Sequence, residues 1–363
     1  MPLQFDIFLP GPGNYRLEIQ AQDAGENLSP PSEAIEASYD LDWIAIRQPA
    51  FPIPSDRITA LAVLGTMRYI GTEDAGLAMF ERFVGWQYLN TANTPLADAH
   101  VTAVWPYTIG GQRRPWIGTM NGGLRAWIAG QEVFCNTDNS SLPANHVTAI
   151  SFSTHGAWIG TLGGGVARID TTAWTWRVNN TGNSPLPSDR VTAIAHAANG
   201  AWVGTEDRGL AKWTPGGAGW TLHNTGNSAL PSDRITCIAV DSSQNVWVGT
   251  DGGGLAVLRG TTWTTYRATP SGLPSDRILS LLAGPERPAA TMWIGTPAGL
   301  ARFRQPGWRT FTTRNSLLPG DTITALGYAY LGWPLWVGTD RGLVNFRGDT
   351  GGAPSPPVAR FRP

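Results

Sequence analysis

Short apolar stretches alternate with polar turn residues along most of the chain, and they recur at a regular period. The tetrad [WY]-[IV]-G-T occurs seven times, and successive copies of its glycine are 42 to 47 residues apart. A Gly-Leu or Gly-Val pair follows each tetrad, and an apolar stretch precedes it, as in LPSDRVTAIA at 186–195. A period of this length is typical of repeat architectures. The tetrad glycines are Gly71, Gly118, Gly160, Gly204, Gly249, Gly295 and Gly338.

Each repeat holds four short runs rich in Val, Ile, Thr and aromatic residues, separated by Gly, Pro, Asn and Asp, which predicts four β-strands. Four strands of about six residues and four turns of about five account for the period. The innermost run is apolar on both faces, as in Val191, Ala193 and Ile194, so both faces of each sheet need covering. Neighbouring sheets packed around a channel provide this cover. The pattern therefore predicts an all-β fold, a β-propeller of four-stranded antiparallel blades with strands A to D counted outward.

The two ends of the chain supply complementary parts of one blade. The last repeat has three strands and then runs into a Pro-rich stretch without a Trp strand. A predicted strand at 42–48 precedes the first complete repeat, and its Trp43 lies ten residues before Ile53. In other repeats the same spacing separates the Trp of strand D from the residue that opens the next inner strand. We therefore predict seven blades, with strand 42–48 completing the seventh and leaving no open edge inside the ring. Glu132 replaces the outer Trp in the second repeat, which predicts a weaker outer strand there.

The repeats resemble the two-component regulator propeller repeat, whose pattern is LPsnxVxxIxxDxxGxLWiGTxxGLxry, across residues 42–347. Residues 12–40 resemble the last two strands of a triple-tyrosine or fibronectin-III-like domain, which accompanies such propellers. The resemblance implies three regions: a partial Ig/fibronectin-III-like β hairpin extension at 1–40, the seven-bladed propeller at 42–347, and a Pro-rich C-terminal tail at 348–363. It also implies a WD40-like bacterial ligand-binding sensor for signal transduction, located outside the cytoplasm as a periplasmic or secreted protein.

Composition and charge exclude several classes of function. The chain has 26 basic and 27 acidic residues, so it lacks the positive charge that nucleic acid or an anionic membrane would attract. No run approaches the roughly 20 apolar residues of a membrane span, and the first residues do not form a signal peptide. Two cysteines and five scattered histidines give no metal-binding spacing, so no metal and no cofactor are predicted.

Two polar elements recur where the chain enters each inner strand and at each B–C turn. Because strands alternate in direction, both elements lie on the same face, around one mouth of the channel. This candidate rim has mixed charge and could bind a small polar or anionic ligand or a glycan. The structural alternative is that each Asp caps its turn and each Arg pairs with a neighbouring turn. The candidate rim residues are Asp56, Arg57, His100, His146, Asp189, Arg190, Asp233, Arg234, Asp276, Arg277, Asp340 and Arg341.

Most of the 17 tryptophans occupy repeat positions and are expected in the core. A second candidate site is made of aromatic residues in the long A–B connections of the second and seventh repeats, on the opposite face. Exposed there, they would bind a protein partner or a glycan; the alternative is that the extra strand length packs on itself. These residues are Trp105, Tyr107, Tyr328, Tyr330 and Trp333.

The sequence favours a non-catalytic ligand-sensing or protein-interaction propeller, with no catalytic residue assigned. The alternative is a propeller enzyme, a lyase or glycoside-active enzyme with carboxylates in the central channel. Asymmetry distinguishes the two, because an active site needs convergent polar residues that do not repeat from blade to blade. The departures from the repeat in blades 2, 3 and 7 are therefore the first places to look for a ligand.

Overall fold

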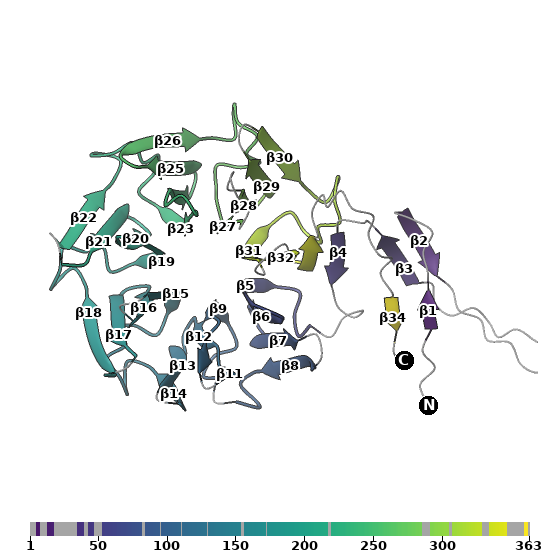
Figure 1. Ribbon diagram of the computed structural model, residues 1–363, viewed down its shortest axis with the longest axis horizontal. Coiled ribbons are helices and arrows are strands. Elements are labelled where there is room, and N and C mark those ends of the chain that lie inside the picture. Colours follow the sequence, from purple (N-terminus) through teal and green to yellow (C-terminus); the bar gives the residue numbers. More distant parts are fainter. Residues whose placement is uncertain are drawn as a thin grey trace, which may run out of the picture.

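A computed structural model gives the structure of the 363-residue chain. It describes residues 53–346 apart from 82–83, 95, 110, 129, 154–155, 172, 217–218, 285–290, 305–306 and 329–333, and also strands 5–7, 13–17, 35–39, 43–46 and 359–361. Every regular element among these residues is a β-strand, and seven four-stranded antiparallel sheets surround a central channel (Figure 1). The predicted seven-bladed β-propeller is confirmed.

Strands A to D of each blade follow one another along the chain, except that blade 7 takes strand D from the N-terminal side. Blade 1 consists of β5 (Ile58–Leu64), β6 (Met67–Thr72), β7 (Leu77–Glu81) and β8 (Gly85–Leu89). Blade 2 consists of β9 (Val101–Trp105), β12 (Trp116–Thr119), β13 (Leu124–Ile128) and β14 (Gln131–Cys135). Blade 3 consists of β15 (Val147–Ser153), β16 (Gly156–Thr161), β17 (Gly165–Asp170) and β18 (Thr175–Asn179). A small extra hairpin, β10 (Thr108–Ile109) and β11 (Gln112–Arg113), lies in the A–B connection of blade 2.

The remaining blades repeat the same order. Blade 4 consists of β19 (Val191–Ala197), β20 (Gly200–Thr205), β21 (Leu210–Thr214) and β22 (Gly219–His223), and blade 5 consists of β23 (Ile235–Val240), β24 (Val246–Thr250), β25 (Leu255–Arg259) and β26 (Thr262–Tyr266). Blade 6 consists of β27 (Ser280–Ala283), β28 (Met292–Thr296), β29 (Gly299–Arg304) and β30 (Gly307–Phe311). Blade 7 consists of β31 (Ile323–Tyr328), β32 (Leu335–Thr339), β33 (Gly342–Phe346) and β4 (Trp43–Ile46).

The tetrad threonine and the glycine that follows it build the B–C turn. In blade 4 the Thr205 hydroxyl donates to the carbonyl of Gly209 at 2.7 Å, and the same bond occurs in all seven blades at 2.7–3.1 Å. Gly209 has φ +82°, and a Cβ there would lie 2.4 Å from the carbonyl oxygen of His223. Only glycine fits this position, which explains the recurring G-T…G-[LV] pattern.

The tetrad glycine is the point of closest contact between blades. A Cβ on Gly204 would lie 2.5 Å from Cγ2 of Ile235, the residue that opens the inner strand of blade 5. The same glycine-to-Val or glycine-to-Ile approach recurs at all seven interfaces, at 2.4–2.8 Å. At the last interface Gly338 of blade 7 receives Ile58 of blade 1. The described core is correspondingly divided into seven apolar clusters, one between each pair of adjacent blades.

Hydrogen bonds around the channel reinforce these contacts. The Thr192 hydroxyl of blade 4 donates to the carbonyl of Ile235 in blade 5 at 2.7 Å. The Thr324 hydroxyl of blade 7 donates to the carbonyl of Ile58 in blade 1 at 2.6 Å, so one of these bonds joins the two ends of the ring. In blade 6 the donor is Ser280. The other threonines that make this bond are Thr59, Thr102 and Thr148.

Strand β4 completes blade 7, as predicted. It pairs antiparallel with β33, with Trp43 opposite Phe346 and Ile46 opposite Leu343 (Figure 1). Ile46 is buried in the cluster between blades 7 and 1. The flanks of the predicted strand 42–48 lie outside the described residues.

Two further strand pairs lie outside the blades. Strand β2 (Gly13–Leu17) pairs with β3 (Ile35–Tyr39), and β1 (Phe5–Ile7) pairs with β34 (Ala359–Phe361) in the predicted Pro-rich tail. The division into a 1–40 extension, a propeller at 42–347 and a 348–363 tail stays a prediction.

The outer strand of blade 2 is as long as its counterparts, and all five of its residues pair with β13. Glu132, which replaces the usual Trp, forms an ion pair with the buried guanidinium of Arg125. Arg125 stands where other blades have Ala or Val beside the tetrad, so the two substitutions compensate for each other. The lower stability expected for this strand stays a prediction.

The glycine contact gives a stability prediction. Gly204→Ala forces a methyl group into Ile235 and should lower the free energy of unfolding by about 1–3 kcal/mol. Gly307→Ala is the matched control, because a Cβ there meets nothing within 4 Å. Urea denaturation of both variants checks this, and equal stability of the two would contradict the proposed role of the tetrad glycine.

Candidate functional site

Three of the rim aspartates hold the connection that leads into their inner strand. Oδ1 of Asp189 accepts the backbone N–H of Thr181 at 2.7 Å, and Oδ2 accepts the Thr181 hydroxyl at 3.0 Å. Asp233 binds Thr225 in the same way. Oδ1 of Asp276 accepts the backbone N–H of Ala268 at 2.7 Å. Each Asp thus caps a loop eight residues upstream, in place of the local turn that the sequence suggested.

Most rim arginines pair with an acidic B–C turn. Arg57 binds Asp74 at 2.7 Å and Glu73 at 3.2 Å within blade 1. Arg190 pairs with Glu206 within blade 4. These guanidinium groups are about half exposed, so solvent screens each pair and its contribution to stability is small. Their charges are largely balanced by the protein itself.

Asp251 is shared between two blades. It lies 3.0 Å from the guanidinium of Arg234 in its own blade 5 and 3.3 Å from that of Arg277 in blade 6. The B–C turn of blade 6 carries Pro297 and Ala298 in place of an acid, so Arg277 reaches across to its neighbour.

The backbone of the Asp-Arg pair clamps two B–C turns together. In blade 4 the Arg190 carbonyl accepts the N–H of Glu206 in its own turn, and the Asp189 carbonyl accepts the N–H of Gly165 in the turn of blade 3. Equivalent bonds recur in blades 2 and 3, where His100 and His146 replace Arg. This confirms that the two polar elements share one face, and it gives the repeated pair a structural function.

The side chains of His100 and His146 break the symmetry of the rim. Burial lowers the pKa of His146, and the neighbouring His100 lowers it further, while Asp98 and Glu206 act in the opposite direction. His146 thus interacts electrostatically with one imidazole and two carboxylates. In blade 7, Asp340 and Arg341 are exposed, and the backbone N–H of Asp340 donates to Thr322. Asp56 in blade 1 is half-buried.

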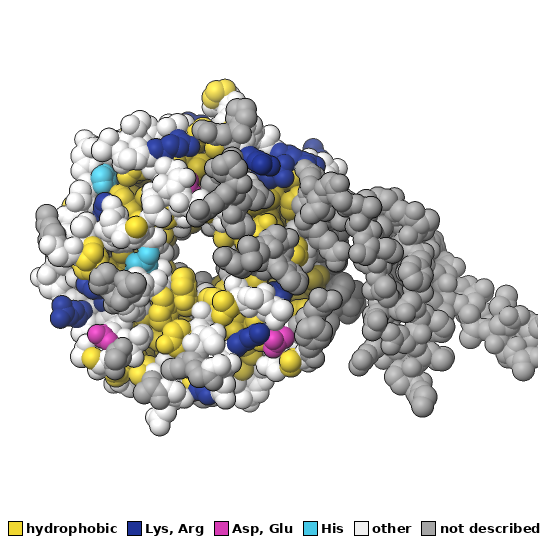
Figure 2. All heavy atoms as spheres, in the orientation of Figure 1, with side chains coloured by type: hydrophobic (Ala, Val, Ile, Leu, Met, Phe, Trp, Pro, Cys, Tyr) yellow, Lys and Arg dark blue, Asp and Glu magenta, His cyan; other side chains and the backbone are white. Residues whose placement is uncertain are grey.

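The structure divides the aromatic candidates on the opposite face. Trp105 and Tyr107 stack on Phe152 of blade 3, with ring centroids 5.7 and 5.2 Å apart, and are half-buried. Tyr328 packs in the cluster between blades 6 and 7. Tyr330 and Trp333 lie outside the described residues. Figure 2 shows this face, where hydrophobic side chains lie along the edge of the channel opening over β9 and β15.

The described residues show neither a metal-binding cluster nor a cysteine thiolate. No group of three or more His, Cys, Asp or Glu among them is arranged to hold a metal ion. Burial raises the pKa of the Cys135 thiol to about 11 and that of Cys237 to about 12, so neither is a thiolate at neutral pH.

Comparison with known families identifies the repeat. A family model described as the two component regulator propeller matches residues 229–252, which enter and form the first two strands of blade 5. The resemblance to the two-component regulator propeller is confirmed. No curated protein matches the chain in sequence.

Solved structures share the propeller fold. The extracellular domain of the hybrid two component system BT3049 from B. thetaiotaomicron has a TM-score of 0.72 and 19% identity, over 92% of this chain and 45% of that one. The extracellular domain of BT4673 from the same organism has a TM-score of 0.67 and 16% identity, over 93% and 46%. PorZ, a surface component of the type-IX secretion system of Porphyromonas gingivalis, has a TM-score of 0.61 and 16% identity, over 87% and 48%.

These neighbours are thus extracellular or surface proteins, and this chain spans less than half the length of each. Among the residues that the structure describes, no helix is long and apolar enough to cross a membrane.

Sequence reasoning missed the inter-blade threonines and a repeated asparagine that fixes the outer connection after blades 1, 2, 3, 4 and 6. In blade 3 the Asn183 amide donates to the carbonyl of Val178 at 3.0 Å, and its Oδ1 accepts the N–H of Asn180 at 2.9 Å. Threonine follows the first Val or Ile of every inner strand except that of blade 6, which has Leu279. The recurrence of threonine at this position was the signal in the sequence from which the inter-blade hydrogen bonds could have been predicted.

The coupling at the rim predicts a titration result. His100→Gln should raise the pKa of His146, because a neighbouring positive charge is removed. His223→Gln is the control, since this half-buried histidine lies in the outer strand β22. NMR titration of the His146 ring protons measures the effect, and an unchanged pKa in His100→Gln would show that the imidazoles do not interact.

Proposed function

We propose that this propeller is the ligand-recognition part of an extracytoplasmic sensor and binds a small anionic ligand at the rim of blades 2 to 4. The observation that carries the proposal is the replacement of Arg by His in two adjacent blades. There, His100 acts electrostatically on His146, whereas Arg57, Arg190 and Arg234 are paired with carboxylates within their own blades. The extracellular neighbours support the proposed location.

Three features favour an anion over a neutral ligand. Imidazole side chains can donate hydrogen bonds, and an imidazole that binds a proton becomes a cation. The Arg190 guanidinium pairs with Glu206, and this carboxylate also acts electrostatically on His146. Its pair with Glu206 is partly exposed, so an incoming carboxylate or phosphate can exchange with the Glu206 carboxylate. The repeated Asp-Arg backbone bonds hold these groups in place without using their side chains.

The pH dependence follows from the titration of His146. Its pKa lies below the ordinary value in the free protein, and a bound anion stabilises the protonated imidazole. Binding therefore takes up a proton, and affinity should increase as the pH falls from 7.5 to 5.5.

Isothermal titration calorimetry with phosphate, citrate and galacturonate tests the proposal. At least one of these anions should bind the full chain, more tightly at pH 5.5 than at pH 7.5. The double variant His100→Gln/His146→Gln should lose about tenfold in affinity, which corresponds to about 1.4 kcal/mol. Arg190→Ala should also weaken binding, because it leaves Glu206 without its cation.

His223→Gln provides the matched control and should bind like the wild type. Failure of all three anions to bind, or equal affinity of the double variant and the wild type, would refute the rim site.

A further inference from the structure

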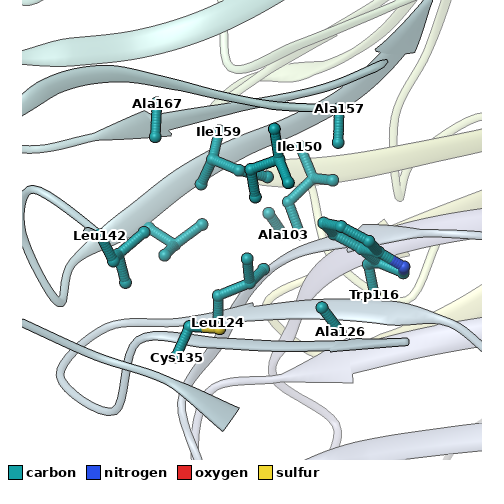
Figure 3. Packing of buried hydrophobic residues seen from close by; sticks show 12 residues of the cluster. Ala103, Trp116, Leu124, Ala126, Cys135, Leu142, Ile150, Ala157, Ile159 and Ala167 are labelled. Atoms are coloured by element: carbon teal, nitrogen blue, oxygen red, sulfur yellow. The ribbon is translucent and has the colours of Figure 1, made fainter. Parts of the chain in front are cut away.

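Two arginines lie directly opposite each other in the outer part of blade 3. Arg168 of β17 pairs with Arg177 of β18, so both side chains are on the same face of the sheet, where like charges are destabilising. Other blades avoid this cost: in blade 4 the residue opposite Lys212 is the uncharged Thr221. In blade 2 the counterpart of Arg168 is Ala126, which is buried among apolar side chains in the interface with blade 3 (Figure 3). The ring therefore does not need a charge at this place.

Tryptophan rings hold Arg168 in position. Its guanidinium lies 4.7 Å from the ring centroid of Trp158 and 4.2 Å from that of Trp213, in the interface between blades 3 and 4. Burial lowers the pKa of Arg168, and the neighbouring Arg177 lowers it further. Asp170 ends the same strand, and its Oδ1 accepts the backbone N–H of Ala173 at 2.9 Å.

The arginine pair has no anion to balance it within the part of the chain that the structure describes. Neither Arg168 nor Arg177 forms an ion pair or a side-chain hydrogen bond with a described residue, and Nε of Arg168 is buried without an acceptor. The Arg177 side chain is exposed. An anion that approaches from solvent can therefore reach it and relieve the repulsion between the two guanidinium groups.

The wall of blade 4 that faces this pair is apolar. Trp220 of β22 packs against the cluster between blades 3 and 4 and is half-buried. Leu222 lies two residues further along the same strand, so it points to the same side, and it is 37% exposed. Guanidinium groups thus border one side of the surface between β18 and β22, and apolar side chains border the other. These two strands follow one another around the circumference of the ring (Figure 1).

Blade 6 has an arginine pair in the same register but in a different setting. Arg302 lies opposite Arg309. The guanidinium of Arg302 lies 5.8 Å from the ring centroid of Trp293, and that of Arg309 lies 4.8 Å from the ring centroid of Phe311. Both cations are thus held over rings of their own blade. Blade 6 provides a matched comparison for the pair in blade 3.

We propose that the surface made of Arg168, Arg177, Trp220 and Leu222 docks an extended segment of a protein partner in which acidic and apolar residues alternate. Side chains of an extended segment point to opposite sides in turn. Carboxylates on one side can then accept hydrogen bonds from the arginines, and apolar side chains on the other can pack on the wall of blade 4. Arg and Trp are the residues that dominate binding energy in protein interfaces. The surface lies on the circumference and is separate from the proposed rim site.

Fluorescence anisotropy with the full chain and three labelled, capped dodecapeptides tests the proposal. The first peptide alternates Glu and Leu, the second replaces Glu by Lys, and the third replaces Leu by Ser. Arg177→Gln is the decisive variant, because it removes an exposed charge and should keep at least the wild-type Tm. Arg309→Gln is the matched control, since it makes the same change at the same register position of blade 6.

The Glu-Leu peptide should bind, and it should bind more weakly as the salt concentration rises. Arg177→Gln should lose about tenfold in affinity, which corresponds to about 1.4 kcal/mol, while Arg309→Gln binds like the wild type. Leu222→Ser should also weaken binding, because it removes part of the apolar wall. The double variant His100→Gln/His146→Gln should bind the peptide unchanged, which separates this surface from the rim.

The proposal is overturned if the Glu-Leu peptide does not bind, or if the Lys-Leu or Glu-Ser peptide binds as tightly. Equal losses in Arg177→Gln and Arg309→Gln would also overturn it, because they would show unspecific attraction between charges. Analytical ultracentrifugation tests a different occupant. Self-association of the wild type that Arg177→Gln abolishes would show that a second copy of this chain covers the surface, and the proposed partner would be wrong.

Discussion

The structure depends on a single contact repeated around the ring: a β-branched side chain from one blade pressed onto the backbone of the next at a glycine. One partner must lack a side chain and the other must be branched at Cβ, since a Cβ on the glycine would approach the Val or Ile to 2.4–2.8 Å. The Val and Ile residues are fully buried there. Seven such contacts form a closed ring, in which the contact from Gly338 to Ile58 joins the last blade to the first. Close packing therefore sets the spacing between blades, and this spacing determines how far apart the polar groups at the channel mouth lie.

This constraint separates structural from functional residues. The polar residues that repeat, such as Asp189, Arg190 and the tetrad threonines, bind neighbouring turns and keep adjacent blades in register. The residues that depart from the repeat are concentrated in blades 2 and 3. His100 and His146 replace arginine there and change the chemistry of the mouth. Evolution of a binding site on such a ring needs changes at positions where packing between blades does not depend on the side chain.

Much of the fold was predictable because it rests on repetition. The tetrad period gave the blades, and the ten-residue spacing from Trp43 to Ile53 placed the strand that completes blade 7. Side-chain roles were harder to predict, because they depend on pairing across blades. The Thr324 hydroxyl donates to the carbonyl of Ile58, which is far away in sequence. Three of the rim aspartates, such as Asp189, bind a loop eight residues upstream.

The central claim is that the two ends of the chain meet in one sheet, and cysteine cross-linking tests it most directly. Ala45 and Val344 are opposite each other in β4 and β33, so Ala45→Cys/Val344→Cys should form an intramolecular disulfide on mild oxidation. The pair Ile44→Cys/Val344→Cys, offset by one residue, points to opposite faces of the sheet and should not. Equal yields from the two pairs, or no disulfide within the chain for Ala45→Cys/Val344→Cys, would contradict the closed ring.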